Sequence, residues 1–533
     1  MPPNWENFAA LTVERLDLFG EFFKIKKVAL WGNFLRAASP DLVVDASAGR
    51  VSDKKRRLKS VREKNEKKTR GGKMASPLII SVSGLRGEIG ATLTPEVAVR
   101  YALAYSKSVA ADGPFVIARD GRRSGSIFAD AICAALNAVG RSTIDAGIAA
   151  TPTVGVLIRD RGAAGGIQIS ASHNPKQYNG LKLFSAEGRV VPTAEGEKVL
   201  AVYRAIEAGT ESAADWVDVD RLGERTTLED STKAHLDAVL KTVDVDAIRA
   251  KNFRVLLDSN NASGSLLGKR LLEELGCEVA ICGETPNGDF LHTPEPTVDN
   301  LKSVFEKIVE AKAVVGFCQD PDADRLAVVD ENGRYIGEEY TVAICAKNRL
   351  QKAKKNGETG PFNLVINCAT SRMTIDVAES FGGACFRSPV GEANVVDLMK
   401  AKNAIFGGEG NGGPIDPSVG FVRDSFVGMA QILEAMAREG KPVSALADEI
   451  PGYSIIKRKL DLPEGGFDKV VEAVAAAFPN EEKNFEDGLR IDWPDAWVLV
   501  RPSNTEPICR VIAEAPTADR ANELCDRVEA LMR

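Results

Sequence analysis

From Met74 onward, short apolar runs alternate repeatedly with longer stretches rich in Ala and Leu. The runs contain aliphatic, aromatic and β-branched residues, which favour strands, whereas the longer stretches have the spacing of helices packed on one face. Three strand–helix pairs show the pattern: Phe115–Ala118 before Ser126–Val139, Phe253–Leu257 before Ser265–Leu275, and Phe362–Ile366 before Thr374–Phe381. This alternation predicts βαβ units in three similar α/β domains with mixed, largely parallel sheets.

After Pro451 the pattern changes. We predict a strand-like run, a helix over Lys469–Phe478, a strand over Ala496–Val500, and a closing helix over Thr517–Met532 with Thr517 as its N-cap. This segment indicates a smaller C-terminal α+β domain. The predicted domains cover residues 74–228, 229–336, 337–453 and 454–533.

The composition is that of a globular protein, with 44% hydrophobic and 27% charged residues. The sequence contains neither a bilayer-spanning apolar run nor a secretory signal pattern. Its nine cysteines form no CxxC pair, which is typical of reduced cysteines in a cytosolic protein. We therefore expect a cytoplasmic protein that does not associate with membranes.

Residues 1–73 show no periodic pattern, and Val51–Lys73 carries eleven Lys and Arg against three Asp and Glu. A basic run of this kind indicates a solvated, disordered extension or, as an alternative, an RNA-binding arm. A mis-assigned start is the interpretation we favour, with translation beginning at Met74. The rest of the chain is acidic, since the whole carries a net charge of −7, and this argues against nucleic acid as a partner.

The segment Asp320–Arg325 places Asp320, Asp322 and Asp324 at alternate positions between two apolar runs. Like charges so close together are unfavourable unless a cation binds them. Alternate spacing in an extended loop turns the three side chains to one side, where they present oxygens to a hard divalent metal. An EF-hand is excluded because Arg325 stands where that loop needs Gly. Mg²⁺ is the predicted metal, and an acidic turn is the alternative.

Ser170–Pro175 follows the apolar run Gly166–Ile169 and contains Ser172 beside His173. Adjacent side chains on a strand or helix point apart, so His173 is poorly placed to act as a base for Ser172. A serine that accepts and donates phosphoryl beside Mg²⁺ needs no Ser-His-Asp triad, because positioning and charge neutralisation drive the transfer. The alternative is a serine in a turn or N-cap.

Two further loops have the composition of ligand-binding segments. The glycine-rich Gly407–Gly413 carries Glu409 and Asn411, a carboxylate and an amide that suit adjacent sugar hydroxyls; a flexible loop is the alternative. The second loop offers donors suited to a dianionic phosphate, and a polar turn is the alternative. Its donors are Arg501, Ser503, Asn504, Thr505 and Arg510. We expect all these loops at the carboxyl ends of strands or in comparable positions, because ligands bind there in open α/β sheets.

In order and spacing, these four motifs resemble the α-D-phosphohexomutase family. The resemblance extends from about Met74 to Arg533. It implies four domains around a deep central cleft. It also implies an isomerase that interconverts hexose 6-phosphate and hexose 1-phosphate through a phosphoserine and a bisphosphate. Mg²⁺, phosphorylated Ser172 and a hexose 1,6-bisphosphate primer are the implied cofactors, a phosphosugar is the substrate, and the protein is expected to be a monomer or homodimer.

The same resemblance implies residue roles. Ser172 is the expected phosphoserine and binds Mg²⁺ together with Asp320, Asp322 and Asp324. Glu409 and Asn411 belong to the sugar-recognition loop, and the donors from Arg501 to Arg510 hold the substrate phosphate. The remaining expected catalytic residues are Arg86, Lys182, Arg325 and His173. Lys182 is the candidate proton carrier, because a desolvated lysine among cations can lose its proton.

One position departs from the family pattern. Many bacterial members have histidine where this chain has Gly413, so the acid–base role rests on Lys182 and His173. The Gly408–Gly413 loop and Ser388–Asn394 resemble the branch that includes archaeal-type phosphoglucosamine mutases. The first expected substrate pair is therefore glucosamine 6-phosphate and glucosamine 1-phosphate. A phosphomannomutase/phosphoglucomutase is the alternative, and a Mg-dependent sugar phosphatase is a more distant one.

Overall fold

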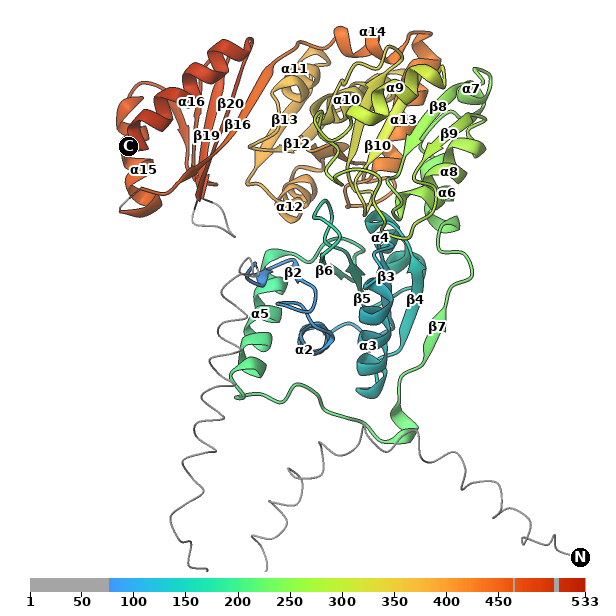
Figure 1. Ribbon diagram of the computed structural model, residues 1–533. Helices are drawn as coiled ribbons and strands as arrows, with labels where there is room; N and C mark the ends of the chain where they lie inside the picture. The colour runs from blue at the N-terminus through green and yellow to red at the C-terminus, as the bar shows by residue number, and fades with distance from the viewer. Residues whose placement is uncertain (1–75, 464, 503–507, 533) are drawn as a thin grey trace, which may run out of the picture. The chain divides into compact units, whose positions relative to one another are not determined.

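The computed structural model describes residues 76–463, 465–502 and 508–532. The basic segment 1–73 lies outside the described residues, as do Ser503, Asn504 and Thr505 of the predicted phosphate loop. The chain divides into two units, and the second, Ala75–Arg533, contains every described residue. This unit holds four sheets with flanking helices, three mixed and the last antiparallel, which confirms the predicted four-domain α/β architecture (Figure 1).

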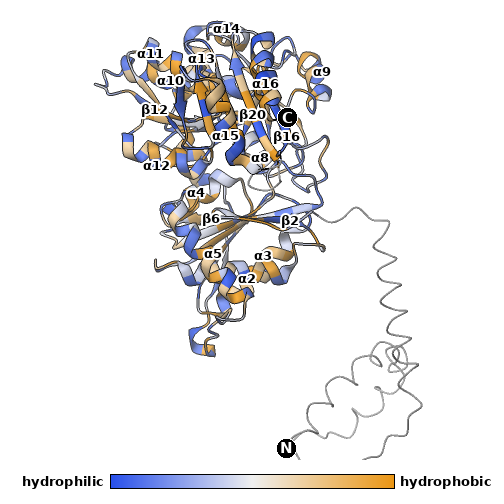
Figure 2. Cartoon of the chain, turned by 90° about the vertical axis from the view of Figure 1, so that its left-hand side faces the viewer, coloured by the Kyte–Doolittle hydropathy of each residue, from blue (hydrophilic) through white to orange (hydrophobic). Residues whose placement is uncertain are grey.

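The first domain contains a seven-stranded sheet. Its elements are β1 (Ile79–Ser81), β2 (Gly84–Glu88), α2 (Pro95–Ser108), β3 (Phe115–Arg119), α3 (Gly125–Ala138), β4 (Thr143–Ile148), α4 (Thr151–Asp160), β5 (Gly165–Ile169), β6 (Tyr178–Ser185), α5 (Thr193–Glu207), a 3-10 turn (Val219–Arg221) and β7 (Arg225–Thr227). The strand order is β1-β2-β6-β5-β3-β4-β7, parallel from β5 to β7 and antiparallel elsewhere. Hydrophobic and hydrophilic residues alternate along α2, α3 and α5, whose apolar side chains form one core with the sheet (Figure 2).

The second and third domains each contain three parallel strands and one antiparallel edge strand. The second comprises α6 (Lys233–Leu240), α7 (Val245–Arg249), β8 (Arg254–Asp258), α8 (Gly264–Glu274), β9 (Glu278–Cys282), α9 (Lys302–Glu310), β10 (Val315–Gln319) and β11 (Leu326–Asp330), in the order β11-β10-β8-β9. The third comprises α10 (Glu338–Lys355), β12 (Asn363–Asn367), α11 (Met373–Ser380), β13 (Ala384–Ser388), α12 (Glu392–Lys402), β14 (Phe406–Glu409), β15 (Gly413–Ile415), α13 (Ser425–Glu439) and α14 (Val443–Asp448), in the order β13-β12-β14-β15.

A shared hydrophobic core joins the second and third domains. Helix α13 is buried along most of its length and packs against α10 of its own domain and against α6, α7 and α8 of the second. The Asp424 carboxylate caps α13 by accepting the Phe426 amide at 2.9 Å, and its other oxygen lies 2.7 Å from Nε2 of buried His235. Nδ1 of His235 lies 3.0 Å from the Thr153 hydroxyl on α4. One buried histidine therefore links the first three domains.

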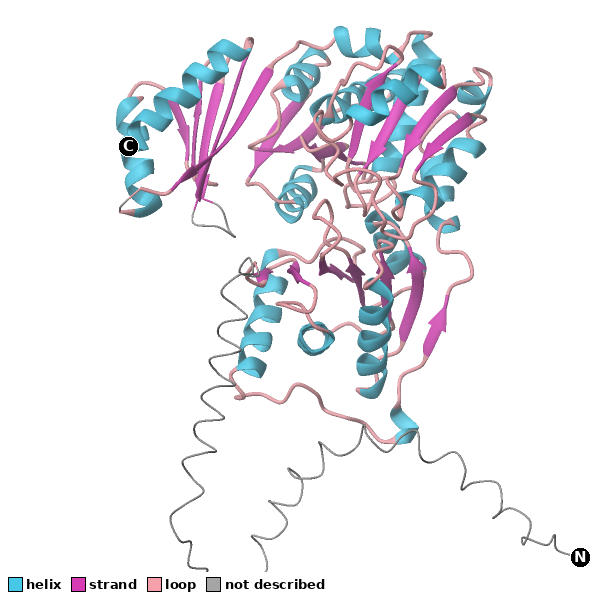
Figure 3. Ribbon diagram, in the orientation of Figure 1, coloured by secondary structure: helices cyan, strands magenta, loops and turns pink. Residues whose placement is uncertain are grey.

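The C-terminal domain is an antiparallel sheet covered by two helices (Figure 3). It comprises β16 (Ser454–Asp461), α15 (Gly466–Ala477), β17 (Glu482–Asn484), β18 (Leu489–Asp492), β19 (Trp497–Pro502), β20 (Ile508–Ala515) and α16 (Ala518–Met532), in the order β16-β20-β19-β18-β17. Alternate strand residues face opposite sides. Val498 and Val500 join the core with the helices, whereas Trp497 and Leu499 pack with Cys368 of the third domain.

The predicted elements agree with the structure except at some ends. The strand predicted over Phe362–Ile366 is β12, shifted by one residue, and the closing helix is confirmed as α16. The Thr517 hydroxyl accepts the Arg520 amide at 3.3 Å, as expected of an N-cap. Helix α15 begins three residues earlier than predicted. Across the described ranges, no helix combines the length and the apolar character that crossing a bilayer requires.

Glu339, at the start of α10, is largely buried where the third and fourth domains meet. Its carboxylate accepts the Ser371 amide at 2.9 Å and lies 3.8 Å from Nζ of Lys457 on β16. Burial, offset only in part by Lys457, raises the pKa of Glu339 from its ordinary 4.5 to about 8. Near neutral pH this carboxyl group is therefore largely protonated in the folded protein and ionised in the unfolded chain.

We predict that Glu339 makes folding less favourable as the pH rises. Because the folded-state pKa is the higher one, the contribution of Glu339 to stability is complete below pH 4.5 and is lost as the pH rises through 8. Thermal unfolding between about pH 5 and 9 should therefore show a steeper fall in Tm for the wild type than for Glu339→Gln. Equal slopes for the two proteins would contradict this assignment.

Candidate active site

Ser172 occupies a tight loop between β5 and β6. Its φ of 47° lies in the left-handed region, which is strained for a residue other than Gly. The Ser172 amide donates to the Ser170 hydroxyl at 2.8 Å, and the Ser172 carbonyl accepts from Nη2 of Arg122 at 2.8 Å. These contacts hold the loop from two sides and fix where the Ser172 hydroxyl points.

A buried ion pair supports this loop from beneath. The Asp120 carboxylate pairs with Arg122 and accepts the Ser170 hydroxyl at 2.6 Å. Burial raises the pKa of Asp120, while Arg122 and Ser170 favour its charged form. Of the arginines between residues 119 and 124, Arg122 is the one that contacts the Ser172 loop.

The three aspartates converge at the turn between β10 and β11. Their carboxylates are fully buried and supply one oxygen each within 4.8 Å of the others. The predicted extended loop was wrong: the segment is a turn in which Ala323 has a φ of 55°. The side chains therefore meet because the chain reverses direction, and not because alternate residues of an extended strand share a face.

The cluster has the properties of a site for a divalent cation. Burial, together with the charges of Asp322 and Asp324, raises the pKa of Asp320 well above its ordinary value. Burial also opposes ionisation of Asp322, but Lys182 and the Thr151 hydroxyl hold its pKa below the ordinary value. Among the described residues, Oδ1 of Asp322 and Oδ1 of Asp324 have no hydrogen-bond partner. Three acidic side chains, with two oxygens that accept no hydrogen bond, fit a hard cation such as Mg²⁺.

The serine and the aspartate cluster are in direct contact. The Ser172 hydroxyl donates to Oδ2 of Asp320 at 2.8 Å, although the two residues lie in different domains. Nδ1 of His173 is 3.3 Å from the Ser172 hydroxyl, so the expectation that these neighbours point apart was wrong. The left-handed backbone at Ser172 is neither strand nor helix, and the alternation rule therefore does not apply there.

Several basic side chains surround the cluster, among them Arg86, Arg325 and His173. Nη1 of Arg86 donates to Oδ1 of Asn174 at 2.6 Å, and burial lowers the pKa of Arg86. The guanidinium of Arg325 lies 3.9 Å from the carboxylates of Asp320 and Asp324. Burial and then the charges of Arg325 and Arg86 hold the pKa of His173 well below its ordinary value.

Lys182 differs from what its sequence context suggested. Its ammonium lies 2.7 Å from Asp324 and 3.4 Å from Asp322, so its nearest partners are anions and not cations. Burial favours the neutral amine, but these two carboxylates raise the pKa of Lys182 above its ordinary value. The argument that surrounding cations lower this pKa is therefore corrected, whereas a role in proton transfer stays a prediction.

The predicted sugar loop packs directly on the aspartate turn. The Leu326 amide donates to the Gly412 carbonyl at 2.8 Å, and a Cβ on Gly412 would lie 2.3 Å from the Leu326 carbonyl oxygen. Glu409, which ends β14, accepts hydrogen bonds from Asn367 at 2.7 Å and from Arg423 at 2.8 Å. The side-chain amide oxygen Oδ1 of Asn411 is buried and has no hydrogen-bond partner among the described residues.

Arg423 was missed by the sequence analysis. It lies outside all four motifs, directly before the Asp424 cap of α13, and its side chain is only 9% exposed. Its guanidinium reaches Asp324 at 2.6 Å and Glu409 at 2.8 Å. An arginine and an aspartate before a helix give no signal for these contacts, because Asp324 and Glu409 lie in other segments of the chain.

The described part of the predicted phosphate loop lies at the ends of β19 and β20. Arg501 and Arg510 are cross-strand partners, and Arg501 pairs with Asp487 at 3.2 Å. Within the described residues, neither arginine forms a hydrogen bond or ion pair with Ser172 or with the aspartates. All four motif loops follow the carboxyl end of a strand, as expected. The strands that precede the first three loops, β5, β10 and β14, each have a parallel neighbour, whereas β19 is antiparallel, and each loop leads into an adjacent antiparallel strand.

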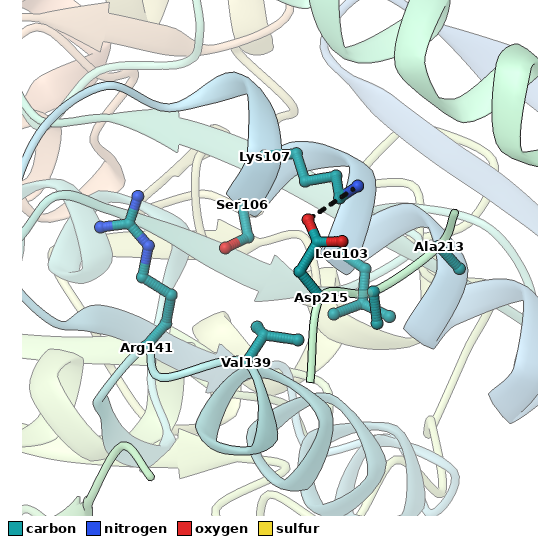
Figure 4. A pocket seen from close by; sticks show the side chains of 8 residues that line it. Leu103, Ser106, Lys107, Val139, Arg141, Ala213 and Asp215 are labelled. Atoms are coloured by element: carbon teal, nitrogen blue, oxygen red, sulfur yellow. Dashed lines mark ion pairs between the residues drawn. The ribbon is translucent and has the colours of Figure 1, made fainter. Parts of the chain in front are cut away.

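A cavity of about 190 Å³ lies in the first domain, away from these residues. Lys107 at the end of α2, Arg141 and Asp215 line it, and Lys107 pairs with Asp215 at 3.2 Å (Figure 4). None of the predicted site residues contributes to its wall.

Comparison with known proteins places the chain in a family. Models of the phosphoglucomutase/phosphomannomutase alpha/beta/alpha domains I, II and III match residues 78–210, 233–333 and 338–453, and the C-terminal domain model matches residues 457–531. A phosphoglucomutase/phosphomannomutase of Thermococcus kodakarensis is 36% identical over 449 residues, which cover 83% of this chain and 95% of the relative. A probable phosphoglucosamine mutase of Methanopyrus kandleri is 31% identical, covering 85% of this chain and 97% of the relative.

The fold agrees with this relationship. A crystal structure of a phosphoglucomutase/phosphomannomutase family protein from Burkholderia thailandensis matches with a TM-score of 0.74 and 25% identity, over 85% of this chain and 97% of that one. Because four family domains occur in order over nearly all the described residues, the chain belongs to the phosphoglucomutase/phosphomannomutase family of phosphohexomutases, which are isomerases.

Proposed function

We propose that the protein interconverts hexose 6-phosphates and hexose 1-phosphates through phosphorylated Ser172 and a bound hexose 1,6-bisphosphate. The observation that carries this proposal is the 2.8 Å contact between the Ser172 hydroxyl and Asp320, in a cluster of three buried carboxylates. A buried nucleophile beside a cation site is what phosphoryl transfer requires, since positioning and charge neutralisation lower its barrier.

The phosphoryl group is transferred in two steps. The Oγ–P bond of phosphorylated Ser172 breaks while the free hydroxyl of the monophosphate forms a new P–O bond and gives up its proton, and the freed Ser172 Oγ takes up a proton. After the bisphosphate turns over, Oγ gives up this proton as it accepts the phosphoryl group from the other end, and the released sugar oxygen regains a proton. We assign this proton to Lys182 or His173, which lie beside the reacting groups and can exchange one.

The remaining residues would position the substrate and neutralise charge on the transferring phosphoryl group. Asp320, Asp322 and Asp324 would hold Mg²⁺ together with the Ser172 phosphate, and the metal would neutralise charge on the transferring phosphoryl. Arg86 and Arg325 add positive charge beside the same place. Glu409 and Asn411 would bind sugar hydroxyls, and the Arg501–Arg510 loop would hold whichever phosphate is not reacting.

Glucosamine 6-phosphate and glucosamine 1-phosphate are the substrate pair we propose first. Relatives from Methanopyrus kandleri and Pyrococcus abyssi, 31% and 32% identical, are named probable phosphoglucosamine mutases. Mannose and glucose phosphates are the second candidate, favoured by the Thermococcus kodakarensis relative at 36% identity.

All nine cysteines are free thiols, which supports the proposed cytoplasmic location, and we propose a monomer or homodimer.

Mutase activity should depend on Ser172. With Mg²⁺ and a trace of hexose 1,6-bisphosphate, a coupled assay should show turnover of one or more of glucosamine, glucose and mannose 1-phosphates. Ser172→Ala should reduce kcat by more than about 10³-fold, because the group that carries the phosphoryl is lost. Wild-type protein that releases inorganic phosphate instead would contradict the mutase assignment and favour a phosphatase.

Turnover should also require the aspartate cluster. Chelation with EDTA should abolish activity and added Mg²⁺ should restore it, whereas Asp322→Asn should lower kcat by roughly 10²-fold or more even in excess metal. Asp258→Asn is the matched control, because Asp258 is an equally buried carboxylate of the second domain that pairs with His292 outside the cluster. Full activity in EDTA-treated, metal-free protein would refute a metal role for the aspartates.

A further inference from the structure

Arg423 is the one arginine of the described chain that bonds both the aspartate cluster and the sugar loop. Nη2 donates to Oδ2 of Asp324 at 2.6 Å, and Nη1 donates to Oε2 of Glu409 at 2.8 Å. Nε lies 3.4 Å from Glu392, whose other oxygen accepts the Arg423 amide at 2.9 Å. Three carboxylates from separate segments therefore converge on a single buried guanidinium.

The geometry of this contact depends on the planar fork of arginine. A guanidinium presents several N–H donors in fixed directions, so fixing one carboxylate also fixes the direction in which the next one is held. Asp324 belongs to the metal turn and Glu409 to the sugar loop. A lysine at position 423 would keep the charge, but its single ammonium does not define two carboxylate orientations at once.

Gly413 provides the space that Arg423 fills. A Cβ at position 413 would lie 2.5 Å from Cδ, 2.8 Å from Cγ and 2.9 Å from Cβ of Arg423. These atoms form the stem of the side chain and not its mobile tip, so even a methyl group at position 413 would displace the arginine. Arg423 can therefore hold this position only because residue 413 has no side chain.

We propose that Arg423 is a positioning residue that orients Asp324 for the metal and Glu409 for the sugar, in a space left open by Gly413. The proposal rests on the proposed function for the identity of the two ligands. It explains how a residue outside every motif couples two loops of different domains. It also predicts that changes at 423 and at 413 have the same consequences.

The test compares two variants that disturb the contact in different ways. Arg423→Lys keeps the charge but loses the fork, and Gly413→Ala keeps the arginine but displaces it. Titration calorimetry with Mg²⁺ alone should show roughly 10–100-fold weaker binding for both variants, as is typical when a partner of a metal ligand is lost. Titration with glucose 1-phosphate should likewise show weaker binding, and where turnover is measured, KM should rise.

Arg438→Lys is the matched control. Arg438 lies near the end of α13, the helix that Arg423 precedes, and bonds Asn348 and Gln351 of α10, away from both loops. The Arg438→Lys protein should bind Mg²⁺ and glucose 1-phosphate as the wild type does. A purely structural role for Arg423 would lower Tm but leave the dissociation constants of the folded protein unchanged.

The proposal would be overturned if the folded Arg423→Lys and Gly413→Ala proteins bound Mg²⁺ and glucose 1-phosphate with wild-type affinity. A wild type that binds no Mg²⁺ would overturn it as well. The titrations need no turnover. A wild type that binds both probes but isomerises no hexose phosphate would contradict the proposed function, while the binding comparison would still decide the role of Arg423.

Discussion

Three ionisable carboxylates buried within 4.8 Å of one another are the constraint on which the rest of this site depends. Such a cluster is unfavourable unless positive charge compensates it, and the protein supplies Lys182 from the first domain and Arg423 from the third. Burial, and then the charges of Asp322 and Asp324, still raise the pKa of Asp320 well above its ordinary value. A divalent cation would supply further positive charge here, beside the Ser172 hydroxyl that donates to Asp320.

The fold provides rigid supports for the loops that form this cluster. The first three motif loops each close a hairpin of a mixed sheet, and they meet through contacts between domains: Ser172 with Asp320, and Leu326 with Gly412. The core shared through α13 and the buried His235 hold these domains together. The geometry of the candidate site and the packing between domains therefore share elements: α13 begins at Ser425, directly after Arg423 and Asp424.

The sequence was sufficient for elements whose signal is local. The apolar runs located strands such as β12, the Thr517 cap located α16, and the alternating aspartates located the cluster of buried carboxylates. It failed where the backbone left regular conformations: the left-handed Ser172 and Ala323 changed the direction of the His173 and aspartate side chains. It also failed for contacts between distant segments. The anionic partners of Lys182 and the three partners of Arg423 arise only from folding, and no spacing along the chain encodes them.

The transfer of a labelled phosphoryl group tests the central claim most directly. Wild-type protein would be mixed with Mg²⁺, unlabelled hexose monophosphate and hexose 1,6-bisphosphate carrying radioactive phosphate. We expect the label on Ser172, identified in a single phosphopeptide, and then on the hexose monophosphates, with almost none released as inorganic phosphate. Label that passes to water while Ser172 stays unlabelled would contradict a phosphoserine mutase and identify a hydrolase.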